Sequence, residues 1–107
     1  MQDGRERRRS PRYRVNLKAR WEGLLTQGKG TVSDLSITGC FVLSGGETKT
    51  GELVRLEIYF PQEMASLWGE VVYTIAELGF AVQFTFAGEE FDLTLQDLVE
   101  TRELVPT

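Results

Sequence analysis

The sequence contains no histidine and a single cysteine, and both shortages narrow its chemistry. Without histidine the chain has no Ser-His or Cys-His nucleophilic pair and no imidazole zinc site, and it lacks the commonest general base. Cys40 alone cannot form an intramolecular disulfide, which fits a reducing compartment, so we expect a cytoplasmic protein. These absences argue against a hydrolase of any common type. We predict that the protein is not an enzyme and holds no metal or cofactor.

Long apolar runs are also missing. No stretch approaches the roughly 18 residues of a membrane-spanning helix, and no apolar segment follows the arginine-rich N-terminus as in a secretory signal. The 107 residues can bury one modest core but not two, and an apolar content of 41% is ordinary for a globular protein. We predict one domain and no membrane insertion.

Positive charge is scarce outside the first twenty residues. Residues 1–20 hold eight basic and two acidic side chains, a local net charge of +6. Since the whole chain carries −4, residues 21–107 carry −10. This asymmetry indicates that the N-terminal arm meets an anion, although a solvated tail that pairs with its own acidic body would have the same composition.

Apolar residues with a period of two indicate strands. From Tyr13 to Trp21 apolar side chains alternate with polar or basic ones, which predicts a half-buried strand with its basic residues facing outward. After an expected turn over 22–30, further strands are predicted to begin at Thr31 and to cover 40–43, 52–60, 66–75 and 78–86. A glycine-rich hairpin connection is expected over 44–51, and a short turn at Ala76 and Glu77.

The period changes near the C-terminus. Phe91, Leu95 and Leu98 follow i, i+4, i+7, which predicts one amphipathic helix within 88–104. The early acidic residues of this segment are expected to favour the helix N-terminus rather than bind metal. Six short strands followed by one helix favour a small antiparallel barrel over a sandwich, although periodicity alone does not separate them.

Three conspicuous residues are interpreted as parts of the core. Trp21 and Trp68 stand in alternating strands and are expected to pack in the barrel. Cys40 opens an apolar strand and is expected to behave as a small buried hydrophobe.

Two local motifs complement each other chemically. The first is Arg8-x-x-x-Arg12, flanked by Arg7 and Arg9, and the second is Asp34-x-Ser36-x-x-Gly39. Arginine forks hydrogen-bond phosphate or guanine and stack on purines, whereas a carboxylate accepts from the N1–H and N2–H₂ donors of guanine. A serine hydroxyl can donate to phosphate, and a glycine permits positive φ or close approach of a ligand. The pair would suit a ligand that has both guanine and phosphate.

Each motif is weak alone. Arg-x-x-x-Arg arises by chance in any arginine-rich tail, and Asp34 and Ser36 could instead make Asx- and Ser-type turns with Gly39 in the left-handed region.

Together, on this strand pattern, the motifs resemble the PilZ domain family over essentially the whole chain. "ERRRSPRYRV" is similar to the family's arginine motif and first strand, and "VSDLSITGCFV" to its [D/N]xSxxG segment. "GEVVYTIAELGFAVQF" is similar to its late hairpin. The resemblance implies a six-stranded antiparallel barrel that binds the bacterial second messenger cyclic di-GMP (c-di-GMP), with an N-terminal arm that swings onto the barrel when the ligand binds.

The resemblance also implies roles for residues. Arg8 and Arg12 match the arginines that stack on and hydrogen-bond guanine and phosphate, and Arg9 is a further candidate phosphate contact. Arg7 would add a stacking plane, which favours an intercalated ligand dimer over a monomer. The second motif supplies the positions that hold the other guanine and the nearby backbone: Asp34, Ser36 and Gly39.

Tyr73 lies where members often carry an aromatic that faces the ligand. A surface tyrosine that packs only on its neighbours is the alternative.

The expected organisation is a single PilZ domain with a flexible arginine-rich arm (1–12), a β-barrel (13–86) and a C-terminal helix and tail (87–107). The expected output is a changed surface that a downstream protein reads. Two alternatives remain: a ligand-free PilZ domain that binds only protein, and a small nucleic-acid-binding barrel. The charge of −10 outside the arm argues against DNA or RNA, because an acidic barrel repels a polyphosphate.

Overall fold

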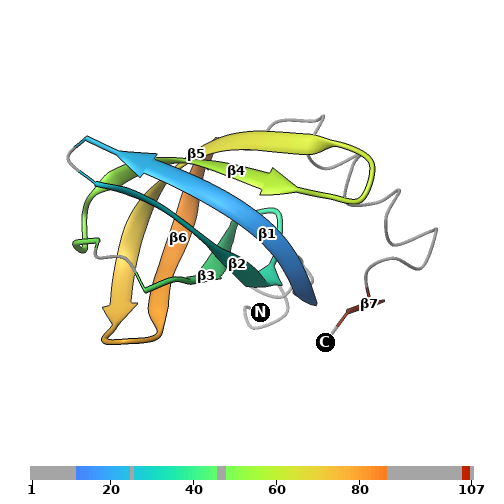
Figure 1. Cartoon of the computed structure of the whole chain (residues 1–107), viewed down its shortest axis with the longest axis horizontal. Coiled ribbons are helices and arrows are strands. Elements are labelled where there is room, and N and C mark those ends of the chain that lie inside the picture. Colours follow the sequence, from blue (N-terminus) through green and yellow to red (C-terminus); the bar gives the residue numbers. More distant parts are fainter. Residues whose placement is uncertain (1–11, 25, 46–47, 87–104, 107) are drawn as a thin grey trace, which may run out of the picture.

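Seven strands form in the computed structural model, which describes residues 12–24, 26–45, 48–86 and 105–106 (Figure 1). In chain order they are β1 (Tyr13–Gly23), β2 (Gln27–Leu35), β3 (Gly39–Leu43), β4 (Leu53–Tyr59), β5 (Met64–Ile75), β6 (Gly79–Phe86) and the two-residue β7 (Val105–Pro106). In this part of the chain no helix is long and apolar enough to cross a membrane.

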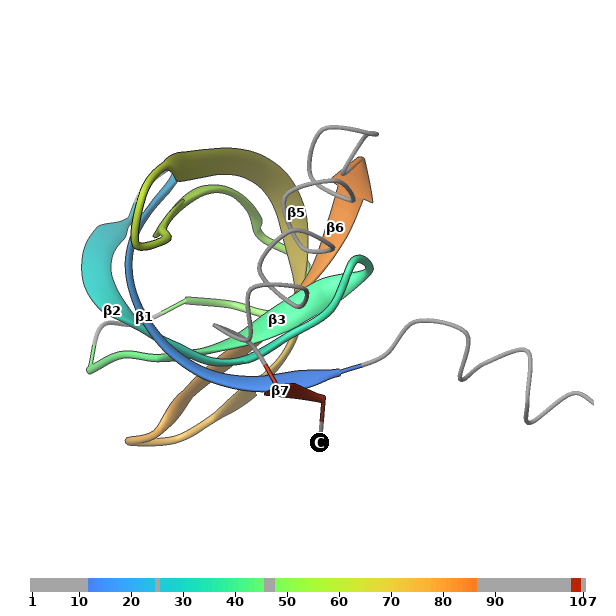
Figure 2. The ribbon, with the colours of Figure 1, turned by 90° about the vertical axis from the view of Figure 1, so that its right-hand side faces the viewer.

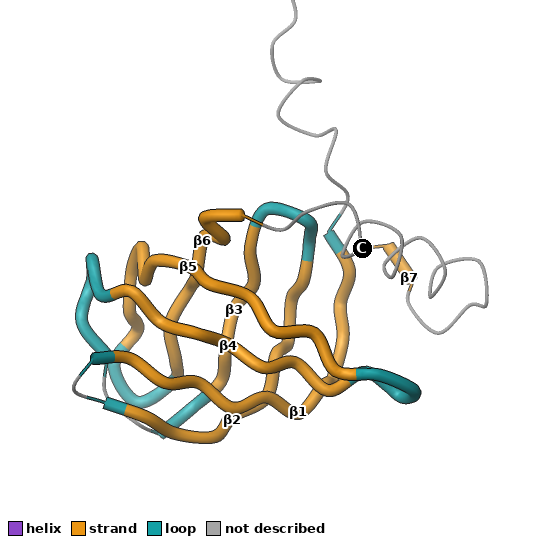
Figure 3. The backbone as a smooth tube through the Cα atoms, turned by 90° about the horizontal axis from the view of Figure 1, so that it is seen from above, coloured by secondary structure: helices purple, strands orange, loops and turns teal. Residues whose placement is uncertain are grey.

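The first six strands close into a barrel. Their order across the sheet is β2-β3-β6-β5-β4-β1, and β1 also pairs with β2, so the sheet returns to its first strand with every pairing antiparallel. Figure 2 looks along this barrel and Figure 3 shows its strands from above. Beside the barrel, β7 pairs with the start of β1, where Val105 faces Arg14. The predicted six-stranded antiparallel barrel is confirmed, whereas the predicted helix lies outside the described residues.

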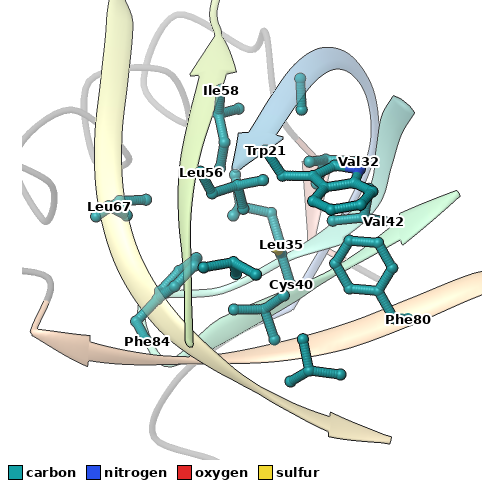
Figure 4. Close-up of a cluster of buried hydrophobic side chains, with 14 of the residues drawn as sticks. Trp21, Val32, Leu35, Cys40, Val42, Leu56, Ile58, Leu67, Phe80 and Phe84 are labelled. Carbon is teal, nitrogen blue, oxygen red and sulfur yellow. The ribbon is translucent and has the colours of Figure 1, made fainter. Parts of the chain in front are cut away.

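Alternation along β1 builds the core as predicted. Tyr13, Ala19 and Trp21 are buried inside the barrel, while the basic residues between them are exposed. The Trp21 ring meets Phe80 edge-on, with ring centroids 5.3 Å apart (Figure 4). Each aliphatic or aromatic side chain that is fully buried in this way contributes about 1.5–3 kcal/mol to folding.

Cys40 is buried in the same core, as predicted. Its burial raises the pKa of the thiol far above the ordinary value, so the sulfur stays protonated and unreactive at neutral pH.

The prediction for Trp68 is wrong. Its side chain is 56% exposed, because Leu67, Gly69 and Val71 take the inward positions of β5 and leave Trp68 on the outer face. With apolar residues on both faces of this strand, the period of two alone did not say which face was buried.

Two connections also differ from expectation. The chain resumes strand conformation at Gln27, so most residues of the predicted turn over 22–30 lie in the paired strands of the β1–β2 hairpin. The hairpin connection predicted over 44–51 is wrong, because the strands on either side of it do not pair: β3 pairs with β2 and β6, whereas β4 pairs with β5 and β1.

The predicted turn at Ala76 and Glu77 is confirmed. The amide of Leu78 donates to the carbonyl of Ile75 at 3.0 Å, and Glu77 adopts a φ of 65°. The β5–β6 hairpin that this turn closes extends to the lower left in Figure 1.

Candidate functional site

A row of cross-strand neighbours crosses the outer face of the barrel. Arg14 on β1 faces Asp34 on β2, Asp34 faces Phe41 on β3, Phe41 faces Ala81 on β6, and Ala81 faces Tyr73 on β5. The small Ala81 therefore lies between two aromatic residues, and an acidic residue lies between an arginine and an aromatic.

Bulges aim two members of this row outward. In β2, Val32 and Leu35 are both buried although they are three residues apart, and the pairing with β3 shifts register between Val32 and Asp34. The extra residue changes the alternation, so Asp34 turns away from the core. A second shift, between Val71 and Tyr73 in β5, does the same for Tyr73, which is 52% exposed.

A surface pocket of about 350 Å³ follows this row. It brings together five of the predicted site residues from segments far apart in the sequence: Arg12, Asp34, Ser36, Gly39 and Tyr73. The other three, Arg7, Arg8 and Arg9, lie outside the described residues.

Further residues line the pocket that the sequence did not single out: Thr38, Phe41, Val72, Ala81 and Gln83. Phe41 and Tyr73 form one wall, with ring centroids 6.2 Å apart and planes inclined at 36°. The available signal for Phe41 was its place between two inward residues, Cys40 and Val42, which directs its ring outward.

Hydrogen bonds within the Asp-x-Ser-x-x-Gly segment hold its turn. The Ser36 amide donates to the Gly39 carbonyl at 2.9 Å, and the Thr38 amide donates to Ser36 Oγ at 3.1 Å. The hydroxyl oxygens of Ser36 and Thr38 lie 2.9 Å apart, and Ser36 is 6% exposed. Ser36 thus makes a Ser-type turn that fixes the pocket wall between β2 and β3.

Position 39 requires glycine for a reason other than the left-handed conformation that the sequence suggested as an alternative. Among the described glycines only Gly51 has a positive φ, so that alternative is wrong for Gly39. A Cβ atom at Gly39 would overlap the carbonyl oxygen of Val82 on β6. The glycine lets β3 and β6 approach each other beneath the pocket.

The charges of the pocket have opposite signs. The Asp34 carboxylate accepts a hydrogen bond from Ser33 Oγ at 3.2 Å, and two arginines lie close to it: Arg12 lines the same pocket, and Arg14 is its cross-strand neighbour. A carboxylate can accept from amide-like donors, while guanidinium groups bind phosphate or stack on a ring. The pocket therefore offers complementary groups for a ligand that carries both ring donors and anionic oxygens.

Solved structures of low sequence identity share the barrel. The Bacillus subtilis inhibitor of motility MotI/DgrA matches with a TM-score of 0.73 and 17% identity over 95% of this chain, which spans only 52% of that protein. The PilZ domain of YcgR from Escherichia coli, solved with c-di-GMP, matches with a TM-score of 0.71 and 15% identity over 91% of this chain and 92% of its own.

A third match is the PilZ domain of CeSA from a cellulose-synthesizing bacterium. Its TM-score is 0.64 at 16% identity, over 86% of this chain and 97% of that domain. The comparison with curated proteins gave no significant match.

The sequence itself matches a family model. The model of the PilZ domain covers residues 6–101, which includes both motifs and all six strands of the barrel. With the barrel and the sequence match in agreement, the chain belongs to the PilZ domain family.

Proposed function

We propose that this domain is a receptor for c-di-GMP, which binds in the pocket between the start of β1, the 34–39 turn and the β5–β6 hairpin. The observation that carries the proposal is the convergence of Arg12, Asp34 and Tyr73 on one pocket. The c-di-GMP held by the YcgR PilZ domain, a similar barrel of the same family, supports the choice of ligand.

Each pocket group has a chemical counterpart in the ligand. Asp34 accepts from the Watson–Crick edge of one guanine, and Arg12 stacks on or hydrogen-bonds guanine and phosphate. The turn built by Ser36 and Gly39 presents the backbone beside that guanine. Tyr73 and Phe41 supply apolar area for the flat base.

The arm completes the site by charge. Arg8 contributes a second motif arginine, Arg9 a phosphate contact, and Arg7 a stacking plane that favours an intercalated pair of ligands. Ordering the arm costs roughly 1–2 kcal/mol per residue in conformational entropy. Bidentate and stacking contacts to a dianion offset this cost. Binding then orders the arm, and the result is a change in the shape of the domain rather than a reaction.

The changed surface is read by another protein in the cytoplasm. On this account the domain has no catalytic role, and its signal is the arrangement of the arm on the barrel.

Isothermal titration calorimetry with c-di-GMP tests the proposal. We expect saturable heat, and two nucleotides per chain if Arg7 supports an intercalated pair. Arg12→Ala and Asp34→Ala should each weaken binding by about tenfold or more, because hydrogen bonds to charged groups contribute roughly 1.5–3 kcal/mol.

Arg20→Ala is the matched control, since Arg20 is an exposed arginine on β1 that does not line the pocket. Its affinity should equal that of the wild type. Normal binding by both pocket variants would reject the site, and one nucleotide per chain would reject the role of Arg7. The absence of heat at tens of micromolar ligand would leave a protein-binding PilZ domain as the better description.

A further inference from the structure

Cations outside the pocket form a row on the outer face of β1 and β2. Arg14, Lys18 and Arg20 follow one another along β1 with Asn16 in the same alternation, and all are exposed. Lys29 on β2 is the cross-strand neighbour of Arg20 and is also exposed. We call these four cations the basic stripe: Arg14, Lys18, Arg20 and Lys29.

Three carboxylates lie beside the basic stripe. Asp34 and Glu57 are the cross-strand neighbours of Arg14 and Arg20, and Glu22 follows Arg20 on the same face of β1. Glu22 pairs with Arg55 at 3.2 Å, and Glu57 lies 3.8 Å from Arg55 while it accepts from the Tyr59 hydroxyl at 2.7 Å. Within the described part of the chain, no ion pair involves Arg14, Lys18 or Lys29. Lys18 and Lys29 have Thr31 and Arg20 as cross-strand neighbours, so among the described residues these two lysines are the members of the basic stripe with no carboxylate directly opposite.

A cavity of about 330 Å³ lies at the far end of the basic stripe. Arg20, Lys29 and Arg55 contribute three cations to its lining, against Glu22 and Glu57. The side chains of the lining therefore carry a net charge of +1, which favours a carboxylate.

We propose that the basic stripe docks an extended acidic segment of another protein. Residues two apart on a regular strand lie about 6.6 Å apart. Lys18 and Arg20 have this spacing, because they lie beyond the register shift that separates Arg14 from Leu17. Carboxylates on every second residue of an extended peptide have the same spacing, and all project to one side. The match of sign and spacing gives the register of the contact.

A nucleic acid fits this surface less well. A polyphosphate that runs past the basic stripe meets an acidic barrel, since residues 21–86 hold eight carboxylates against three cations. None of the four residues is an aromatic on which bases could stack. A short acidic segment ends where the cations end and avoids both difficulties.

The basic stripe begins beside the proposed ligand pocket, since Arg14 is the cross-strand neighbour of Asp34. Docking at the basic stripe does not depend on c-di-GMP, because it uses only the charges and spacing of residues on β1 and β2.

Fluorescence anisotropy with the full chain tests this inference. The probe is a labelled peptide of alternating glutamate and threonine about ten residues long, and the control peptide has lysine in place of glutamate. We expect saturable binding of the glutamate peptide only, weakening with added salt. Lys18→Glu and Lys29→Glu should each reduce its affinity by about fivefold or more.

Lys49→Glu is the matched control, because Lys49 is an exposed lysine in the connection between β3 and β4. It makes the same change of charge away from the basic stripe and should leave the affinity within about twofold. Absence of binding, or an equal loss in Lys49→Glu, would overturn the proposal. Tighter binding of a single-stranded oligonucleotide of equal charge would replace it with a nucleic-acid surface.

A parallel titration with c-di-GMP separates the two proposals. Lys18→Glu and Lys29→Glu should bind c-di-GMP with the affinity and heat of the wild type, whether or not they bind the peptide.

Discussion

At the scale of single residues, Gly39 connects the candidate pocket with the stability of the barrel. It pairs with Gln83 on β6, and the carbonyl of the preceding residue, Val82, lies where a Cβ atom would stand. Gly39→Ala must push β3 away from β6, and we expect a loss of roughly 1–3 kcal/mol in the free energy of unfolding.

Urea denaturation measures this loss. Gly45→Ala is the control, because beyond its two chain neighbours no atom of the described residues lies within 4 Å of a Cβ placed there, and its effect should stay within about 0.5 kcal/mol. Equal stability of the two variants would show that the close approach of β3 and β6 does not constrain Gly39.

The residues of the site were only partly predictable from the sequence. The two motifs give Arg12, Asp34, Ser36 and Gly39 because their side chains, or the lack of one, have recognisable chemistry. Phe41 was missed because an outward phenylalanine inside the apolar run "CFVL" looks like a core residue. Its role depends on Tyr73, which comes from β5 and contacts it only in the folded barrel.

At the scale of elements, the β5–β6 turn contains a strained position. Glu77 has a φ of 65°, a conformation in which a Cβ atom is crowded and which glycine adopts without cost. Glu77→Gly should therefore raise the free energy of unfolding by about 0.5–1 kcal/mol, although glycine also gains freedom in the unfolded chain.

Ala76→Gly in the same turn is the control. Residue 76 has no positive φ, so glycine there brings only the entropic cost and should destabilise the domain slightly. Thermal or urea unfolding of both variants gives the comparison, and destabilisation by Glu77→Gly would contradict the assignment of strain.

The start of β2 is the part of the fold that the sequence predicted least well. Gly28 and Gly30 read as turn residues, yet both lie in the strand. A Cβ at Gly28 would lie 2.8 Å from Trp21 Cζ2, and one at Gly30 would overlap the Leu43 carbonyl. These glycines are required by tertiary neighbours, which local propensity does not report. The alternation in β1 and β4, by contrast, was sufficient to predict those strands.

At the scale of the whole molecule, the strands of the closed barrel position the residues of both proposed surfaces. The pocket draws on β2, β3, β5 and β6 and on Arg12 just before β1, so strands rather than long loops fix most of its side chains. The basic stripe uses the neighbouring outer face of β1 and β2.

An amide NMR titration of the full chain with c-di-GMP tests the central claim most directly. We predict saturable shifts that cluster at residues 34–41, 72–73 and 81–83 around the pocket, with small changes near Leu53 and Trp68, which line a different pocket. No shifts at saturating c-di-GMP, or shifts confined to the surroundings of Leu53 and Trp68, would contradict it.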